Sequence, residues 1–418
     1  MNIHTATING ILETGPKRGA ARRLNGGANP AHALNITDLR SRIDKVAAAA
    51  ATHAVAVDRE SRFPHEAIAA ARAERLLSIA VPRELGGEGL STADVVDVCY
   101  ALGKACASTA MIYAMHQTKV ACLVRHGRGS AWHQLLLRRL CAEQLLLASS
   151  TTEGQAGGDV RHSAAPVEGG AARITLERQA TVISYGEAAD GIVTTARRAA
   201  DAASSDQVLV AFLKDDYRLD RLNGWDALGM RGTCSAGFKL VATGLREQIL
   251  PEPYEKIHSH TMMPFAHLAW SGAWAGIAAA AVDRARAFTR KAAHRSGGTL
   301  PPGAAHLTRA LASLRTLRSL IAAALARFEA ADSETLESLD FQTGMNMHKV
   351  NASELAVATV TSAMQACGLA GYRNDGDFTL GRHLRDVLSA PIMINNDRIL
   401  ANVAAASLLG GTPASLRD

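Results

Sequence analysis

The 418-residue sequence is poor in aromatic side chains, which make up 4% of it, and its six cysteines form no recognisable site. With so few aromatics and no basic stripe among them, a net charge of +6 does not predict a nucleic-acid surface. The cysteines are isolated and lack CxxC or Cys/His ligand spacing, so we expect no metal site. We interpret them as reduced thiols of a cytoplasmic protein.

Several other signals are missing. No run of about 18 apolar residues is unbroken and no secretory leader is evident, so we expect neither a membrane span nor export. The absence of a strand-flanked GxGxxG or a GxxxxGK[ST] motif argues against pyridine-nucleotide enzymes, and the absence of a GxSxG elbow argues against hydrolases. Hydrophobic residues nevertheless make up 48% of the chain, enough for several packed subdomains.

Hydrophobic periodicity divides the chain into four parts. Residues 1–34 show none and are interpreted as a mobile tail. Residues 35–147 repeat apolar positions at helical spacing, residues 148–255 contain short alternating stretches such as ARITLERQATVIS, and residues 256–418 return to long apolar helices. We therefore predict a mainly α, α+β protein in which a β domain separates two helical blocks.

Several strings, in order, resemble signatures of the acyl-CoA dehydrogenase superfamily. They are VPRELGGEGLS, TTEGQAGGD, TVISYGEAAD, WDALGMRGTCS and QACGLAGY. The resemblance covers residues 37–412. It implies an N-terminal helical domain, a middle β-barrel-like domain, a C-terminal four-helix bundle and a flavoprotein oxidoreductase activity.

The resemblance also implies FAD as the cofactor, with FMN left open. A glycine-rich loop such as the one after Thr152 lets backbone N–H groups approach a flavin edge or a phosphate, because no Cβ intervenes. Arg295 corresponds to an arginine on the FAD pyrophosphate of a neighbouring subunit, so we expect a homotetramer or a homodimer. The full set of expected flavin contacts is Thr151, Thr152, Gly157, Gly158, Ser184, Arg295, Gln365, Gly368 and Asn396.

The carboxylate that the superfamily uses to remove the substrate's α-proton has no counterpart at its usual places. Ile394 occupies the common position and Ala266 the alternative one. Asp397 and His116 are the preferred substitutes, followed by His383 and Glu153. Asp397 also fits a surface or capping carboxylate, and His116 also fits a packed helix histidine.

Two reactions and one non-catalytic role follow from this resemblance. The preferred prediction is α,β-dehydrogenation of an acyl thioester, on CoA or a carrier protein, with a non-standard base and an electron-transfer partner. The alternative is a monooxygenase that uses a C4a-hydroperoxyflavin and receives reduced flavin from a separate reductase. A structural subunit without activity is the third. In each catalytic case we expect Met393, Ile394 and Arg231 at the substrate pocket.

Overall fold

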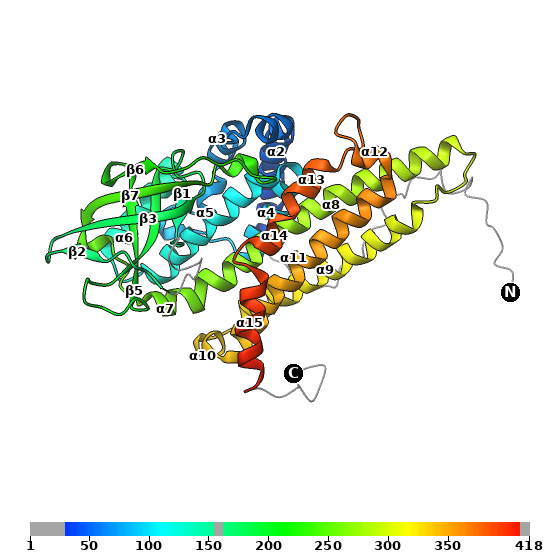
Figure 1. Ribbon diagram of the computed structural model, residues 1–418. Coiled ribbons are helices and arrows are strands. Elements are labelled where there is room, and N and C mark those ends of the chain that lie inside the picture. Colours follow the sequence, from blue (N-terminus) through cyan, green and yellow to red (C-terminus); the bar gives the residue numbers. More distant parts are fainter. Residues whose placement is uncertain (1–29, 154–161, 410–418) are drawn as a thin grey trace.

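The computed structural model describes residues 30–153 and 162–409. The β domain lies at one end of the molecule, and the long C-terminal helices extend away from it (Figure 1). This arrangement confirms the predicted order of helices, sheet and helices. Helix α2 already begins at Pro30, within the predicted tail.

The N-terminal block consists of α2 (Pro30–Glu60), α3 (His65–Ala73), α4 (Thr92–Ala105), α5 (Ala107–His126) and α6 (Ala131–Glu143). Helix α4 starts at a capping box, in which the Ser91 hydroxyl accepts the Asp94 N–H and the Asp94 carboxylate accepts the Ser91 N–H. Helix α5 is buried on almost all sides. It therefore serves as a wall shared by the block, the β domain and the bundle.

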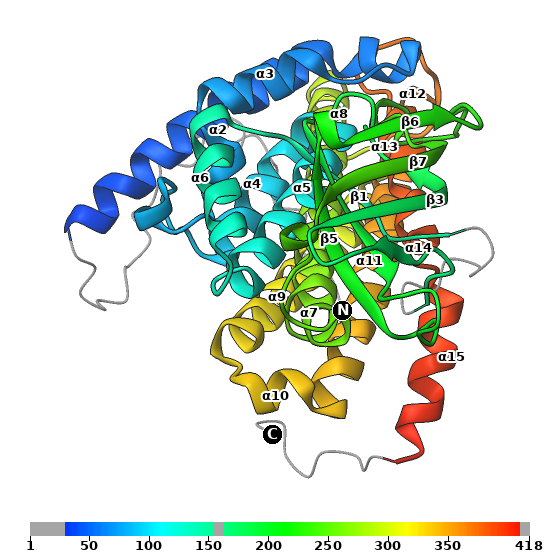
Figure 2. The same cartoon turned by 90° about the vertical axis from the view of Figure 1, so that its left-hand side faces the viewer.

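The β domain contains two sheets, which Figure 2 shows with the β domain facing the viewer. Strands β1 (Leu147–Ser150), β4 (Gly191–Arg197) and β5 (Gln207–Leu213) form the first. The second has the order β2-β3-β7-β6, with bounds Val167–Gly169, Arg173–Ile183, Ala236–Leu245 and Tyr217–Arg221. The β3–β7 register shifts between Ala180 and Ile183, and such bulges redirect the residues that follow.

The C-terminal block has three long helices, α8 (Met263–Arg295), α9 (Ala304–Ala330) and α11 (Leu339–Cys367). The shorter helices are α7 (Tyr254–Ile257), α10 (Ser333–Glu337), α12 (Leu369–Tyr372), α13 (Gly381–Val387), α14 (Ser389–Ile392) and α15 (Asn396–Ser407). The last helix, which the apolar string IMINNDRILANVAAASLL predicts over residues 392–409, is confined to α15 and follows the separate short helices α13 and α14. The break before α15 lies at Ile394 and Asn395, which both have positive φ.

Helices α4 and α8 approach very closely, because glycines face each other. A Cβ on Gly103 would lie 2.3 Å from the Ala273 carbonyl oxygen, and one on Gly276 would lie 2.2 Å from that of Tyr100. The segment Tyr254–Arg295 is long and apolar enough to cross a membrane by composition, but its most apolar stretch is entirely buried in the protein. Its composition is therefore that of a central core helix.

Candidate functional site

A cavity of about 1570 Å³ opens between the β domain, α5, α8, α11 and the α14–α15 segment. Its β-domain wall includes Thr151, Thr152, Val182, Ser184, Trp225, Thr233 and Ser235. Its helical walls include Met111, Met115, Lys119, Ala266, His267, Trp270, Met393 and Ile394. The lining combines apolar side chains with many polar ones, which suits an organic ligand that carries polar groups.

Three hydroxyl groups on the β-domain wall form a chain whose direction can be worked out. The Thr233 hydroxyl donates to the Met230 carbonyl oxygen at 2.8 Å, and a carbonyl can only accept. Ser235 must then donate to Thr233 (2.8 Å), and Ser184 must donate to Ser235 (2.7 Å). The Ser184 oxygen is therefore left as a hydrogen-bond acceptor for a ligand in the cavity.

The two positions where the resemblance places a carboxylate, Ile394 and Ala266, both line this cavity. Ile394 has φ +59°, which is strained for a β-branched residue, and Asn395 follows at φ +51°. The Asn395 side chain accepts the Asp397 N–H at 3.0 Å and so begins α15. Asp397 itself is exposed and is not among the lining residues. The structure thus gives Asp397 a place in the first turn of a helix rather than at a reacting carbon.

Asn396, expected at the cofactor, is instead part of a buried polar cluster. Its Oδ1 accepts from the Lys349 ammonium at 2.7 Å, and its Nδ2 donates to the Ser353 hydroxyl at 3.0 Å. Lys349 also donates to the Ala390 carbonyl oxygen at 3.1 Å. Asn396 therefore ties α15 to α11 and does not line the cavity.

His116 does not line the cavity either, and both of its ring nitrogens are occupied by backbone. Nε2 lies 2.8 Å from the Leu77 carbonyl oxygen, so it donates, and Nδ1 accepts the Leu147 N–H at 3.0 Å. Burial lowers the His116 pKa to about 4. The ring is therefore neutral and ties α5 to β1, which replaces the predicted role as a base.

The two remaining candidate bases are also engaged away from the cavity. The Glu153 carboxylate accepts the Ser163 hydroxyl and the Ala164 N–H, both at 2.7 Å. His383 is buried in α13, which holds its pKa well below the usual value, and it does not line the cavity. No substitute base proposed from the sequence reaches the cavity.

Arg231 lies at an interface between domains and does not line the cavity. Its Nε donates to the Asp58 carbonyl oxygen at 2.8 Å, and its Nη1 donates to the Ala227 carbonyl oxygen at 2.9 Å. A Cβ on Gly229 would lie 2.1 Å from the Arg385 carbonyl oxygen. The string WDALGMRGTCS thus packs the β domain against α2 and α13.

Arg295, Gln365 and Gly368 do not line this cavity. Arg295 is the exposed last residue of α8, Gln365 is exposed, and Gly368 ends α11 with φ +56°. The following helix, α12, lies at the end of the bundle away from the β domain (Figure 1). A role at another subunit's cofactor stays a prediction. Gly157 and Gly158 lie outside the described residues.

The sequence interpretation missed two buried polar residues on the cavity wall. The Nδ1 of His267 lies 3.1 Å from the Met345 carbonyl oxygen and must donate to it. Burial lowers the His267 pKa to about 3, so the ring is neutral and Nε2 carries a lone pair. The other residue is Lys119, 3% exposed on α5. His267 is a polar residue within an apolar helical stretch, whereas Lys119 follows three other polar residues and gives no such signal.

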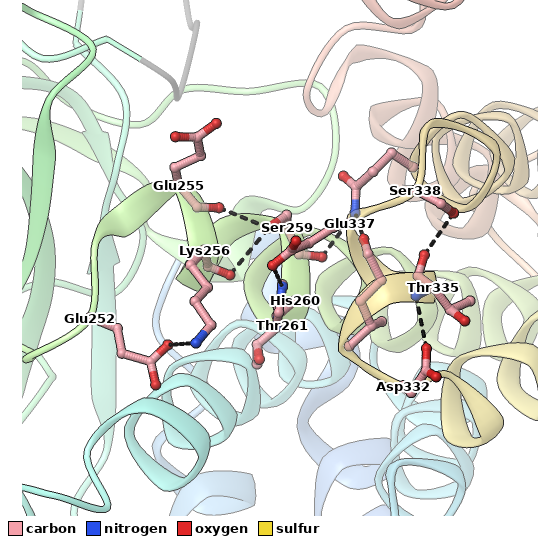
Figure 3. A network of polar contacts seen from close by, with 12 residues as sticks. Glu252, Glu255, Lys256, Ser259, His260, Thr261, Asp332, Thr335, Glu337 and Ser338 are labelled. Atoms are coloured by element: carbon pink, nitrogen blue, oxygen red, sulfur yellow. Dashed lines mark hydrogen bonds and ion pairs between the residues drawn. The ribbon is translucent and has the colours of Figure 1, made fainter.

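One rim of the cavity is built around a π-helical turn, His258–Met262, between α7 and α8. Figure 3 shows its contacts: the His260 ring bonds to the Glu337 carboxylate of α10 at 2.8 Å, and the Ser259 hydroxyl donates to the Glu255 carbonyl oxygen at 3.0 Å. Lys256 pairs with Glu252 at 3.2 Å. Such turns are frequent at functional sites.

Within residues 30–153 and 162–409, no group of three or more His, Cys, Asp or Glu residues could hold a metal ion.

The fold and this cavity define a class, and comparison with known proteins identifies it. The model of the acyl-CoA dehydrogenase N-terminal domain matches residues 36–143, and that of the C-terminal domain matches residues 260–409. The chain belongs to the acyl-CoA dehydrogenase superfamily.

Relatives within the superfamily differ in the reactions that their names describe. The chain is 28% identical to L-evernosamine nitrososynthase from Micromonospora sp., over 90% of each chain. It is 26% identical to the probable acyl-CoA dehydrogenase fadE25 from Mycobacterium leprae, over 86% of this chain and 91% of the relative. The structure of FMN-bound TdsC from Paenibacillus sp. A11-2 superposes with a TM-score of 0.75 at 18% identity, covering 89% of this chain and 98% of that one. The fold is therefore shared by proteins whose names describe different activities.

Proposed function

We propose that this protein is a flavin-dependent monooxygenase that transfers an oxygen atom to a small polar substrate. The observation that carries the proposal is the apolar wall formed by Ile394 and Ala266. Dehydrogenation of an acyl thioester requires a base close to the α-carbon. His267 is a poor candidate for that base, because a ring with a pKa of about 3 holds a proton only weakly. The proposal therefore places the monooxygenase ahead of the dehydrogenase, which the sequence alone favoured.

The cavity suits a flavin. Thr151, Thr152 and Ser184 offer polar atoms on the β-domain wall, while Val182 and Trp225 offer apolar surface on the same wall. A bound flavin in its reduced form would supply the two electrons needed to place one atom of O₂ on the substrate and to release the other as water. Ser184 presents an acceptor, which suits an N–H group of such a ring. FAD is the expected form and FMN the alternative.

The remaining walls would exclude water from the reaction. Met111, Met115, Met393 and Ile394 supply apolar surface, and the neutral His267 can accept a hydrogen bond from a substrate N–H or O–H group. A site that excludes water limits the hydrolysis of reactive intermediates. The lack of a carboxylate at Ile394 and Ala266 leaves no proton acceptor at these two positions, as expected for a reaction that needs no α-proton base.

The proposal extends to partners. A separate reductase would supply reduced flavin in the cytoplasm. Exposed Arg295 and Gln365 at the far end of the bundle support an assembly in which one subunit's bundle end reaches another subunit's flavin. A homotetramer or homodimer fits that arrangement.

The experiment that tests the proposal is an anaerobic titration of the oxidised, flavin-loaded protein with butyryl-CoA and octanoyl-CoA. A monooxygenase keeps its visible flavin spectrum, because nothing removes the α-proton. The variant Ile394→Glu places a carboxylate on the same wall and is the matched positive control. Bleaching of the wild-type flavin by either thioester would overturn the proposal and restore the dehydrogenase interpretation.

A further inference from the structure

We propose that Lys119 forms a subsite for an anionic group of the substrate, a carboxylate or a phosphate. The inference deepens the proposed function by specifying the substrate's charge, and it rests on that function only in taking the cavity as the substrate site. Its basis is a buried lysine that lines the cavity and has no counter-ion among the residues that the structure describes.

Lys119 lies on α5, is 3% exposed and lines the cavity. An ammonium group has three donors. Among the described residues, its one hydrogen-bond contact is the Met262 sulfur at 3.5 Å, and a thioether is a weak acceptor. No carboxylate in the described part of the chain lies within ion-pair distance of it. Burying an unpaired charge is costly, so a partner that binds there is strongly favoured.

A second buried lysine shows how the same fold satisfies an ammonium when no ligand is needed. Lys349 is fully buried, donates to the Ala390 carbonyl oxygen and to the Asn396 amide oxygen, and lies 5.8 Å from the Trp274 ring centroid. Within residues 30–153 and 162–409, Lys119 has no such oxygen partners. The contrast indicates that Lys119 keeps its donors for a bound molecule.

The groups that act electrostatically on Lys119 also favour an anion. Cys122, one turn along α5, is buried, which raises its thiol pKa to about 12 and keeps it neutral. Arg178 on β3 is a second buried cation, with Nη1 bonded to the Thr195 side chain and 3.4 Å from Glu153. Burial, helped by Arg178, lowers the Lys119 pKa to about 8, so the ammonium still predominates at neutral pH. Arg178 is thus paired with Glu153, whereas Lys119 has no carboxylate partner in the described part of the chain.

The carboxylates that line the cavity belong to its more accessible parts. Glu255 is exposed, Glu337 is exposed and bonded to His260, and Asp206 pairs with Arg198 at 2.9 Å. None of them neutralises Lys119. The predicted substrate therefore carries an anionic oxygen where a simple acyl-thioester substrate would offer apolar chain.

The test uses the flavin-loaded protein and three probes: acetate, inorganic phosphate and pyrophosphate, each at constant ionic strength. Binding is followed by the visible flavin spectrum and by tryptophan fluorescence, since Trp225 and Trp270 line the cavity. Saturation by acetate alone indicates a carboxylate subsite, and saturation by phosphate or pyrophosphate indicates a phosphate subsite. Either result supports the proposal if Lys119→Met weakens binding at least tenfold.

Lys256→Met is the matched control, because Lys256 lines the same cavity but is exposed and paired with Glu252. We expect it to change the affinity less than twofold. Lys119→Arg should retain binding, which separates loss of charge from loss of folding. In wild type, acetate affinity should fall as the pH rises through about 8, where Lys119 loses its proton, and it should be flat in Lys119→Met.

Unchanged anion affinity in Lys119→Met, a loss confined to Lys256→Met, or no saturable binding of any probe would overturn the subsite. These outcomes are independent of the reaction with oxygen. If anions bind through Lys119 but the thioester titration bleaches the flavin, the subsite stands and the proposed monooxygenase function fails.

Discussion

Replacing Lys119 by methionine should stabilise the ligand-free protein, although it removes a charged side chain from a helix. Burial lowers the Lys119 pKa from 10.5 to about 8. At about 1.36 kcal/mol for each pKa unit, this corresponds to roughly 3 kcal/mol of folding free energy lost at pH 7. Methionine has a similar length and no charge, so it avoids this penalty.

The expected stabilisation by Lys119→Met can be converted into a change in melting temperature. The unfolding entropy is about 2.1 cal/mol/K per residue. For a chain of 418 residues, the free energy of unfolding therefore changes by about 0.9 kcal/mol for each degree near the melting temperature. The melting temperature of Lys119→Met should therefore exceed that of wild type by roughly 3 to 4 °C at pH 7. Thermal unfolding of the flavin-loaded, substrate-free protein, followed by circular dichroism, measures this difference.

The pH dependence identifies the cause. Because the Lys119 pKa is lower in the folded state, the unfolded chain binds more protons between pH 8 and 10.5, and wild-type stability rises with pH over that range. Lys119→Met and wild type differ in their free energy of unfolding, and this difference is the stability gap. The part of the gap that is due to the charge of Lys119 should fall to roughly half of its pH 7 value by pH 9.5. Any gain from added apolar burial does not change with pH. A variant less stable than wild type, or a gap of constant size from pH 7 to 10, would refute the reasoning.

Three further predictions follow from the described contacts. Ser184→Ala should weaken flavin binding by about two- to tenfold, the value of one hydrogen bond, measured by titration of the flavin-free protein. Gly229→Ala should destabilise the protein by about 1–3 kcal/mol through overpacking, because its Cβ meets the Arg385 carbonyl oxygen; Gly224→Ala, with open space around it, is the control and should melt like wild type. Burial lowers the pKa of His116 to about 4 and that of His267 to about 3, so stability should be lost as the pH falls below about 6.5, which a melting series from pH 7.5 to 5 measures. A flat series would contradict that account.

The sequence predicted the architecture well, because hydrophobic periodicity reports which segments are helices and strands. It also placed several residues at the cavity, among them Ser184, Met393 and Ile394. These residues lie in or beside segments that match the superfamily's strings closely. The place of each residue along the backbone could therefore be inferred from the superfamily.

The errors arise where the direction of a side chain depends on tertiary structure. Positive φ at Ile394 and Asn395 turns Asn396 towards α11 and leaves Asp397 in solvent, and no pattern in the sequence indicates that turn. The partner of a buried polar residue is likewise invisible in one chain. His116 and Lys119 lie on one helix three residues apart, yet the first is bonded to backbone and the second faces the cavity.

The interruption of the last helix has the same origin. Residues 392–409 are apolar enough to be interpreted as one helix, but the left-handed residues before α15 interrupt it. That interruption brings Met393 and Ile394 to the cavity wall. A local departure from regular structure thus shapes the wall on which the functional proposal depends.

The most direct test of the central proposal is the reaction of the reduced, flavin-loaded protein with oxygen. The protein is reduced anaerobically, mixed with aerated buffer in a stopped-flow instrument and followed across the near-ultraviolet and visible bands. We expect a transient near-ultraviolet absorbance that precedes the return of the oxidised flavin spectrum, because the apolar wall around Ile394 protects the oxygen-activated state. Slow reoxidation in a single step without that transient would contradict the account.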